Sequence, residues 1–593
     1  MSLYTELREK LFQSLLGMES VETQILQNVV LEQPKDKTHG DLATNAAMVL
    51  TKVVGKPPRI LAEELVSIFE AWDAVEKASV AGPGFVNISL KNKSVFDDVL
   101  SVQDSVEPYL EGAEVGKGTK TIVEYVSINP TGPIHVGHGR NAAFGDAIAK
   151  MLEKAGHFVH REYLVNDAGG QIRVLVNSLH ARYLQLFGKD IEVPADGYPG
   201  DYLIDIAKNL KEKDGDKWLN VSDSEVLLDG LRGFAVEACM DLIRADLAVM
   251  GVKFDRFFSE LDMHRESDIM ARAVAILREK GYIYEGVLPP PKGKEMTDYV
   301  PVKLTLFKAT ACGLGEDQPV YKRNGEPTYF GQDIGYHYDK YLRGFRKMVT
   351  VIGADQAGSF TPLAKALSVL TGKDDIYQPV AYEMVKVLRN GEPVRMSKRA
   401  GNFVLLKQVL DEVGKDVFRF MMLTVKPTTP LTFDVAKAIE KTMENPVFYV
   451  QYAHARLASL ERLAAEDLGV RRGEFNEGGE VRDGASEVRG GGAAGGADLD
   501  MLPLVGEAGL DVAKTLMMYP QVFEQSVRLL EPHRLVTYAR EVAAAVHRWY
   551  ADVRMLDKDD LEGTRARLEL AARARYVLAD LLDTCGVAAP ERM

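Results

Sequence analysis

TIVEYVSINPTGPIHVGHGRN, residues 121–141, is the stretch that decides the fold of the central part of this chain. Residues 121–126 are mostly β-branched or aromatic, which predicts a buried strand. Residues 127–135 contain Pro, Gly and Asn and predict a turn, after which a helix is expected to begin near Val136. Because strand–turn–helix units recur downstream, the predicted fold class is α/β with a doubly wound parallel sheet.

The turn between this strand and helix is suited to binding an anion. Backbone N–H groups and the positive end of the helix dipole point out of such a turn, which favours the triphosphate of ATP. His135 and His138 are three residues apart, so both imidazoles face one side of the helix and can donate to phosphate oxygens. Gly137 leaves room for a base. Taken alone, the pattern fits equally a solvated histidine pair or two ligands of a metal site.

A second basic segment, RMSKRAGN, occupies residues 395–402 and follows a Gly- and Pro-containing turn at residues 389–393. Lys398 is a compact charge on a flexible stem, so it suits stabilisation of negative charge on the α-phosphate and pyrophosphate. Arg399 offers a second positive charge. Without other information this segment would be an ordinary basic surface loop.

The order of the two motifs, HxGH after an early strand and MSK in a late loop, resembles the class I aminoacyl-tRNA synthetases. The resemblance implies that His135, His138 and Lys398 are catalytic. It also implies an ATP site formed by His135, Gly137, His138, Met396, Ser397, Lys398 and Arg399, with Mg²⁺ accompanying the ATP.

Residues 329–336, YFGQDIGY, place Tyr329 and Asp333 on one face of a helix. Such a pair is often only a surface contact. A guanidinium pocket, however, needs a carboxylate in bidentate geometry with an aromatic or amide neighbour. The segment resembles the Tyr-x-x-x-Asp element of arginyl-tRNA synthetases, in which the aspartate binds the guanidinium and the tyrosine orients it. This resemblance implies an arginine site formed by Glu124, Ser127, Asn129, Tyr329, Asp333 and Gln356.

The resemblance extends along the chain and implies three domains. Residues 1–112 are expected to form a small α/β domain that contacts the tRNA elbow, and residues 113–437 a Rossmann-like catalytic domain with a helical insertion at about 175–275. Residues 438–593 are expected to form an all-helical anticodon-binding domain, in which the Gly-rich composition of residues 469–500 predicts a flexible loop. The implied tRNA-binding residues are Phe85, Asn87, Tyr449, Tyr452 and Met593.

Composition restricts the remaining possibilities. The net charge of −14 argues against nonspecific nucleic-acid binding, which needs many Lys and Arg, but permits a local basic face. Cys239, Cys312 and Cys585 are far apart, so neither a disulfide framework nor a zinc site is expected. The N-terminus lacks the apolar core of a signal peptide, and no apolar run is long enough for a membrane span. A cytoplasmic monomer is expected.

The predicted activity is that of an arginine–tRNA ligase. It activates L-arginine with ATP, releases pyrophosphate, and transfers arginine from arginyl-adenylate to the 3′ end of tRNA(Arg), releasing AMP. Three alternatives remain open at this point: a class I synthetase for another amino acid, a small-molecule nucleotidyltransferase, and a tRNA-binding homologue without catalytic activity. The Tyr329/Asp333 pair, the late MSK segment and the retained motif residues argue against each of them in turn.

Overall fold

The computed structural model describes residues 1–34, 36–102, 105–113, 115–261, 268–289, 301–394, 404–470 and 501–593. These residues form two compact units. The catalytic unit comprises Gly116–Glu440 and Leu530–His533, and the terminal unit comprises Met1–Val115, Lys441–Leu529 and Arg534–Met593. The segments predicted as N-terminal and C-terminal domains therefore belong to one unit. Among the described helices, none has both the length and the apolar character that a bilayer crossing requires.

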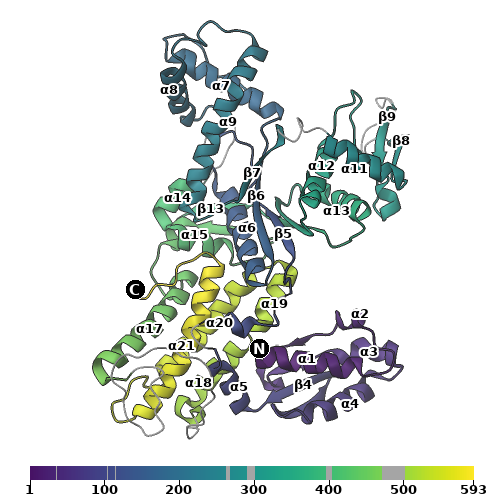
Figure 1. Ribbon diagram of the computed structural model, residues 1–593. Helices are drawn as coiled ribbons and strands as arrows, with labels where there is room; N and C mark the ends of the chain where they lie inside the picture. Colours follow the sequence, from purple (N-terminus) through teal and green to yellow (C-terminus); the bar gives the residue numbers. More distant parts are fainter. Residues whose placement is uncertain are drawn as a thin grey trace, which may run out of the picture. The chain divides into compact units, whose positions relative to one another are not determined.

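A five-stranded parallel sheet forms the centre of the catalytic unit (Figure 1). Its order is β12 (Tyr377–Tyr382), β11 (Lys347–Gly353), β5 (Lys120–Glu124), β6 (Phe158–Val165) and β7 (Arg256–Ser259), and every neighbouring pair runs parallel. The central strand β5 ends at Glu124, which is paired with Thr350 on one side and Glu162 on the other. The predicted α/β fold with a parallel sheet is therefore confirmed.

Helix α6 (Val136–Lys154) follows β5 and is buried along most of its length. Small residues permit this close packing, since a Cβ atom at Gly145 would overlap the ring of Tyr125. On another side α6 contacts α15 (Lys415–Met422), where the buried side chains of Arg419 and Asp146 form an ion pair of 2.5 Å. The middle of α6 is thus packed closely against Tyr125, which follows β5, and tied to α15.

The helical insertion lies between β6 and β7. It consists of α7 (Gly170–Gln185), α8 (Tyr202–Asp214) and α9 (Ser224–Val249). The chain then returns to the parallel sheet at β7 and continues into α11 (Asp268–Glu279) and a small antiparallel sheet of β8 (Ile283–Val287), β9 (Lys303–Phe307) and β10 (Gln318–Pro319). The helical segment that was predicted at about 175–275 thus contains α7, α8 and α9, then strand β7 of the main sheet, and then the start of α11.

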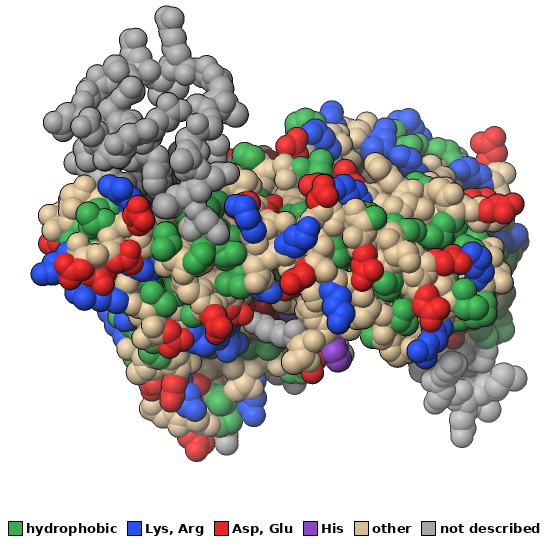
Figure 2. Space-filling view, turned by 90° about the horizontal axis from the view of Figure 1, so that it is seen from below, with side chains coloured by type: hydrophobic (Ala, Val, Ile, Leu, Met, Phe, Trp, Pro, Cys, Tyr) green, Lys and Arg blue, Asp and Glu red, His purple; other side chains and the backbone are tan. Residues whose placement is uncertain are grey.

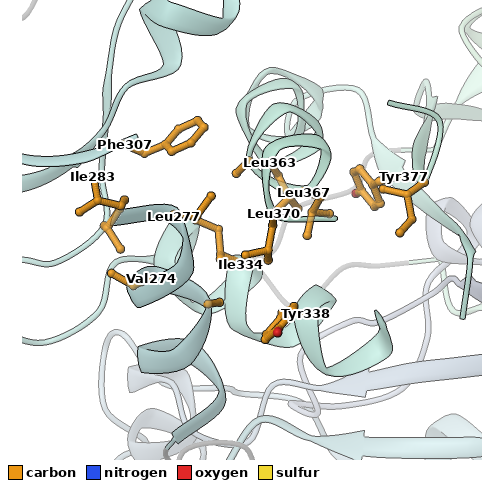
Figure 3. Close-up of a cluster of buried hydrophobic side chains, with 14 of the residues drawn as sticks. Val274, Leu277, Ile283, Phe307, Ile334, Tyr338, Leu363, Leu367, Leu370 and Tyr377 are labelled. Carbon is orange, nitrogen blue, oxygen red and sulfur yellow. The ribbon is translucent and has the colours of Figure 1, made fainter. Parts of the chain in front are cut away.

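A cluster of buried apolar side chains anchors α12 (Tyr329–Leu342), the helix that carries Asp333 (Figure 3). Ile334 and Tyr338 of α12 pack against Leu363 and Leu367 of α13 (Ala357–Thr371) and against Leu277 of α11. Each of these side chains that becomes buried contributes roughly 1.5–3 kcal/mol. The position of α12 is therefore set by its own apolar face.

The terminal unit combines a small sheet with helices. Antiparallel strands β1 (Leu31–Glu32), β2 (Leu42–Thr44), β4 (Phe85–Leu90) and β3 (Val75–Ala81) neighbour one another in this order. The α-helices of this part are α1 (Leu3–Leu16), α2 (Thr23–Leu26), α3 (Ala46–Val54), α4 (Pro58–Glu70), α5 (Asn92–Leu100), α17 (Pro446–Leu468), α18 (Leu502–Met517), α19 (Tyr519–Leu529), α20 (His533–Asp552) and α21 (Leu561–Thr584). Helix α5 packs on α18 and α21, and Arg8 of α1 pairs with Glu524 of α19. The loop predicted at 469–500 lies outside the described residues from 471 onward.

Candidate active site

The turn after β5 has an unusual backbone. Val126 and Ser127 both have positive φ angles, 66° and 40°, and a left-handed conformation at a non-Gly residue costs about 1–3 kcal/mol. The side chain of Asn141 in α6 offsets this cost, because its Oδ1 accepts from the Val126 N–H at 2.7 Å and its Nδ2 donates to the Val351 carbonyl at 3.0 Å. One buried amide thereby ties the turn to strand β11.

The two histidines of the first motif lie side by side. His135 is the residue that precedes α6, and its carbonyl accepts from the N–H groups of His138 and Gly139 at 3.0 and 3.2 Å. The imidazole centroids are 3.7 Å apart, and both rings are half-buried. Two potential donors therefore stand at the positive end of a long buried helix, where an anion is stabilised.

Main-chain contacts hold this motif from two directions. The Ile134 N–H donates to Asp246 Oδ2 of α9 at 3.2 Å, and the Ile134 carbonyl accepts from Leu406 N at 2.8 Å. The Val136 N–H donates to the Val404 carbonyl at 3.2 Å. The predicted ATP residues Met396, Ser397, Lys398 and Arg399 lie outside the described residues. Val404 is the first described residue after residues 395–403. Its hydrogen bond with Val136 therefore places the chain that follows the second motif next to the first motif.

Met384 is a residue of this site that the sequence did not reveal. It follows β12, its side chain is 58% exposed, and its Cε would lie 3.4 Å from a Cβ atom on Gly137. The buried Arg140 guanidinium fixes the neighbouring backbone by donating to the Glu383 carbonyl at 2.6 Å. An exposed apolar side chain beside the histidine motif can pack against the face of a base. Met384 can be assigned to this site only from the structure, because residues 137 and 384 are far apart in the sequence.

Glu124 and Asp333 contribute carboxylates near the carboxyl end of β5. Glu124 is buried, and its Oε2 accepts from Nζ of Lys340 at 2.5 Å. Asp333 is half-buried one turn into α12, and burial, together with the negative charge of Glu124, raises its pKa to about 7. The structure therefore brings these two carboxylates close enough to influence each other.

The other predicted arginine-binding residues have different surroundings. Tyr329 is 83% exposed at the first residue of α12, and Gln356 is exposed just before α13. Asn129 is held in place, because its Oδ1 accepts from Asn166 Nδ2 at 3.0 Å and its Nδ2 donates to Gln171 Oε1 at 2.8 Å. Ser127 Oγ accepts from the Leu164 N–H at 3.1 Å. Gln171 was not anticipated from the sequence.

The predicted tRNA-binding residues all lie in the terminal unit. Phe85 and Asn87 alternate with buried Val86 and Ile88, so they share the outer face of β4. On the helical side, Tyr452 and Met593 line one pocket together with Ala455, Arg456 and Ser459. On the face shown in Figure 2, basic and acidic side chains are interspersed, in keeping with a chain that is not uniformly basic.

Aromatic rings cluster beside this pocket. Tyr452 stacks on Phe448 with centroids 5.6 Å apart, and the His547 ring lies 4.6 Å from Tyr449 and 5.8 Å from Tyr452. The Arg456 guanidinium lies 5.2 Å from the centroid of the Tyr452 ring. Stacked rings with an adjacent guanidinium offer both a platform and hydrogen-bond donors to an unpaired base.

The comparisons with known proteins agree with this arrangement. Residues 5–90 match the family model described as the arginyl tRNA synthetase N terminal domain, and residues 488–593 match the DALR anticodon binding domain. Residues 106–443, more than half of the chain, match the catalytic domain of tRNA synthetases class I (R).

Curated relatives and solved structures point the same way. The arginine–tRNA ligase of Ruegeria pomeroyi is 42% identical over 100% of both chains, and that of Nitrobacter winogradskyi is 43% identical over 96% of this chain and 94% of its own. The arginyl-tRNA synthetase of Thermus thermophilus superposes with a TM-score of 0.71 over 100% of both chains, and its 21% identity makes this likeness evidence for the fold alone. The chain therefore belongs to the arginyl-tRNA synthetases, the class I ligases that activate arginine with ATP and attach it to tRNA.

Proposed function

We propose that the two steps of this reaction take place at the carboxyl end of the parallel sheet, where the guanidinium of arginine binds Glu124 and Asp333. The observation that carries this proposal is the pair of interacting carboxylates beside a strand that leads directly into the histidine motif. Ligands of open α/β sheets bind in this position. A charge-assisted, bidentate pair is the strongest way to select a guanidinium.

Activation needs correct placement more than a protein nucleophile. The carboxylate of arginine attacks the α-phosphorus of ATP in line, a P–O bond forms, and pyrophosphate leaves with the electron pair of the broken bond. His135 and His138 would donate to phosphate oxygens from the start of α6, where their rings stand 3.7 Å apart. Lys398, assisted by Arg399 and the adjoining Met396 and Ser397, would bring further positive charge to the leaving group.

The remaining contacts of ATP and arginine follow from the same geometry. Gly137 would let the nucleoside approach the backbone, and Met384 would pack against the base. Mg²⁺ would bind mainly to phosphate oxygens, as it does with nucleotides; within the described residues, no group of three or more His, Cys, Asp or Glu side chains is placed to hold a metal ion. Ser127 and Asn129 would hold the arginine backbone groups, while Tyr329 and Gln356 would complete the pocket once arginine is bound.

In the second step a hydroxyl of the terminal tRNA ribose attacks the carbonyl of arginyl-adenylate. A C–O bond forms, the bond to phosphate breaks, and AMP leaves. By analogy with the class, the 2′-hydroxyl is the expected first acceptor. Recognition would be divided within the terminal unit, with Phe85 and Asn87 at the tRNA elbow, and Tyr449, Tyr452 and Met593 at the anticodon. We also infer that the enzyme is cytoplasmic and a monomer, and light scattering on the purified chain would test the monomeric state.

Replacing Tyr452 with alanine is expected to raise the KM for tRNA(Arg) by about 5- to 150-fold, because one base stacked on an aromatic ring contributes about 1–3 kcal/mol. The kcat at saturating tRNA should change little, since the site of chemistry is untouched. Aminoacylation rates measured against tRNA concentration would show this. Tyr452→Phe keeps the ring and serves as the matched control. An unaltered KM in Tyr452→Ala would remove Tyr452 from the anticodon site.

The reaction and its substrate are tested by ATP–pyrophosphate exchange with each standard amino acid in turn, with and without total tRNA. We expect exchange with arginine only, and only when tRNA is present. Exchange with another amino acid would contradict the guanidinium pocket. No exchange under any condition would instead favour a tRNA-binding homologue without catalytic activity.

A further inference from the structure

The pocket proposed for a cationic substrate already contains a cation. Lys340 of α12 is fully buried at 0% exposure, its Nζ lies 2.5 Å from Glu124 Oε2, and it is 4.0 Å from the centroid of the Tyr336 ring. A lysine is almost never fully buried unless it is paired. Its partner here is one of the two carboxylates assigned to the guanidinium, so the lysine and the substrate share a ligand.

A second charge cluster is formed around Glu162, the residue of β6 that is paired with Glu124 of β5. Glu162 of β6 accepts two hydrogen bonds from the Arg343 guanidinium, at 2.7 and 2.9 Å, and a third from the Tyr336 hydroxyl at 2.9 Å. His160 of β6 lies 3.7 Å from the same carboxylate. These contacts hold the pKa of Glu162 far below its usual range despite its burial. Arg343 also donates to Asp339 Oδ2 at 2.7 Å, so its guanidinium is engaged by two carboxylates of its own and is not placed to balance Glu124.

The remaining charged groups around Asp333 act on its pKa in both directions. Glu124 from β5 and Glu260 after β7 raise the pKa of Asp333, while Lys340 on its own helix lowers it. His337 of α12 is held neutral by burial, which keeps its pKa well below the usual range, and the phenol of Tyr377 on β12 stays protonated. Lys340 is the cation in contact with Glu124, so it offsets part of the negative charge that surrounds Asp333. A substrate guanidinium would offset more of it.

We propose that Lys340 is a positioning residue that lowers the negative charge of the arginine pocket: it holds one oxygen of Glu124 and offsets the charge of that carboxylate, so that Asp333 remains available to the substrate guanidinium. This inference rests on the proposed function, because it assumes that Glu124 and Asp333 bind arginine. It follows from geometry that joins α12 to β5 across the pocket. Without Lys340, the carboxylates of Glu124 and Asp333 would both face one substrate cation, and a proton would compete with arginine for the excess negative charge.

The test is the arginine KM of Lys340→Met, measured by tRNA-dependent ATP–pyrophosphate exchange from about pH 6 to about pH 9. Loss of the lysine raises the pKa of Asp333, so a larger fraction of the Asp333 carboxyl is protonated at neutral pH. We expect the arginine KM to rise about tenfold at pH 7 and the acid limb of kcat/KM to move up by about one pH unit. The increase in the arginine KM should become smaller toward pH 9. The KM for ATP should stay within about twofold of the wild-type value, since the change lies in the arginine pocket.

Controls separate this role from general damage. Lys340→Arg keeps the charge and should keep the wild-type pH profile. Arg419→Met breaks the buried pair with Asp146 elsewhere in the same unit and should lower thermal stability without moving the acid limb. If Lys340→Met fails to fold, the double variant Lys340→Met/Glu124→Gln, which leaves no unpaired charge at this pair, should fold and show no shift of the acid limb.

The outcomes also separate this inference from the proposed function. If Glu124→Gln raises the arginine KM but Lys340→Met changes neither that KM nor the pH profile, the role of Lys340 is overturned and the pocket stands. A pH-independent rise in Lys340→Met would also overturn it, because it would reveal a purely structural effect. If Glu124→Gln leaves the arginine KM unchanged, the pocket assignment itself fails.

Discussion

Replacing His138 with alanine should lower the kcat of arginine activation by about 10²–10³-fold, because removal of one preorganised donor to a developing negative charge typically has this effect. The imidazole stands 3.7 Å from that of His135 at the start of α6, where the helix dipole adds to its action. The KM values for ATP and arginine should change only a few-fold, since the contact strengthens in the transition state. Steady-state exchange at saturating tRNA measures both quantities.

A matched variant sharpens this prediction. His138→Asn retains an N–H donor of similar reach and should lose less activity than His138→Ala. Equal losses in the two variants would argue that the ring acts by packing against His135 rather than by donating to phosphate. A kcat of His138→Ala close to that of the parent chain would contradict the assigned role altogether.

Replacing Asp333 with asparagine should raise the arginine KM by about 30-fold or more, since truncating one partner of a buried, hydrogen-bonded charge pair costs about 2–5 kcal/mol. The KM for ATP should remain close to that of the parent. The parent should also lose kcat/KM for arginine as the pH falls below about 7, because Asp333 is then protonated. Asp333→Asn should lack this dependence. Arginine kinetics over the same pH range provide the measurement.

The direction of the stability change caused by Asp333→Asn can also be predicted. A carboxyl whose pKa is raised by folding favours its neutral form in the native state, so its ionisation lowers stability as the pH rises through 3.8 toward 7. The asparagine variant does not ionise, and its melting temperature at pH values above about 7 should equal or exceed that of the parent. A clearly lower melting temperature there, or an unchanged arginine KM, would contradict the assignment of Asp333.

The strand, turn and helix around the histidine motif were predictable because their periodicity is local. The predicted strand extended to residue 126, whereas β5 ends at Glu124, since Val126 and Ser127 adopt left-handed angles. Neither residue type favours that conformation. The cause is Asn141, whose amide reaches back to the Val126 N–H from within α6. A long-range hydrogen bond therefore overrides the local preference.

Other features depend on contacts between distant parts of the sequence. Lys340 follows Asp333 by two helical turns, yet its burial against Glu124 depends on how α12 packs on β5. Met384 lies near Gly137, and Arg140, three residues further along the same helix, donates to the carbonyl of Glu383. The association of α5 with α18 and α21 likewise arises from apolar faces far apart in the chain. Composition and periodicity predict the individual helices and strands but not which of them pack against one another.

A crystal structure of the chain with arginine and a non-hydrolysable ATP analogue would test the central claim most directly. The account predicts a guanidinium within hydrogen-bond distance of both Glu124 and Asp333, with the triphosphate at the start of α6 beside His135 and His138. A guanidinium bound away from both carboxylates, with the nucleotide elsewhere than at this helix start, would contradict it.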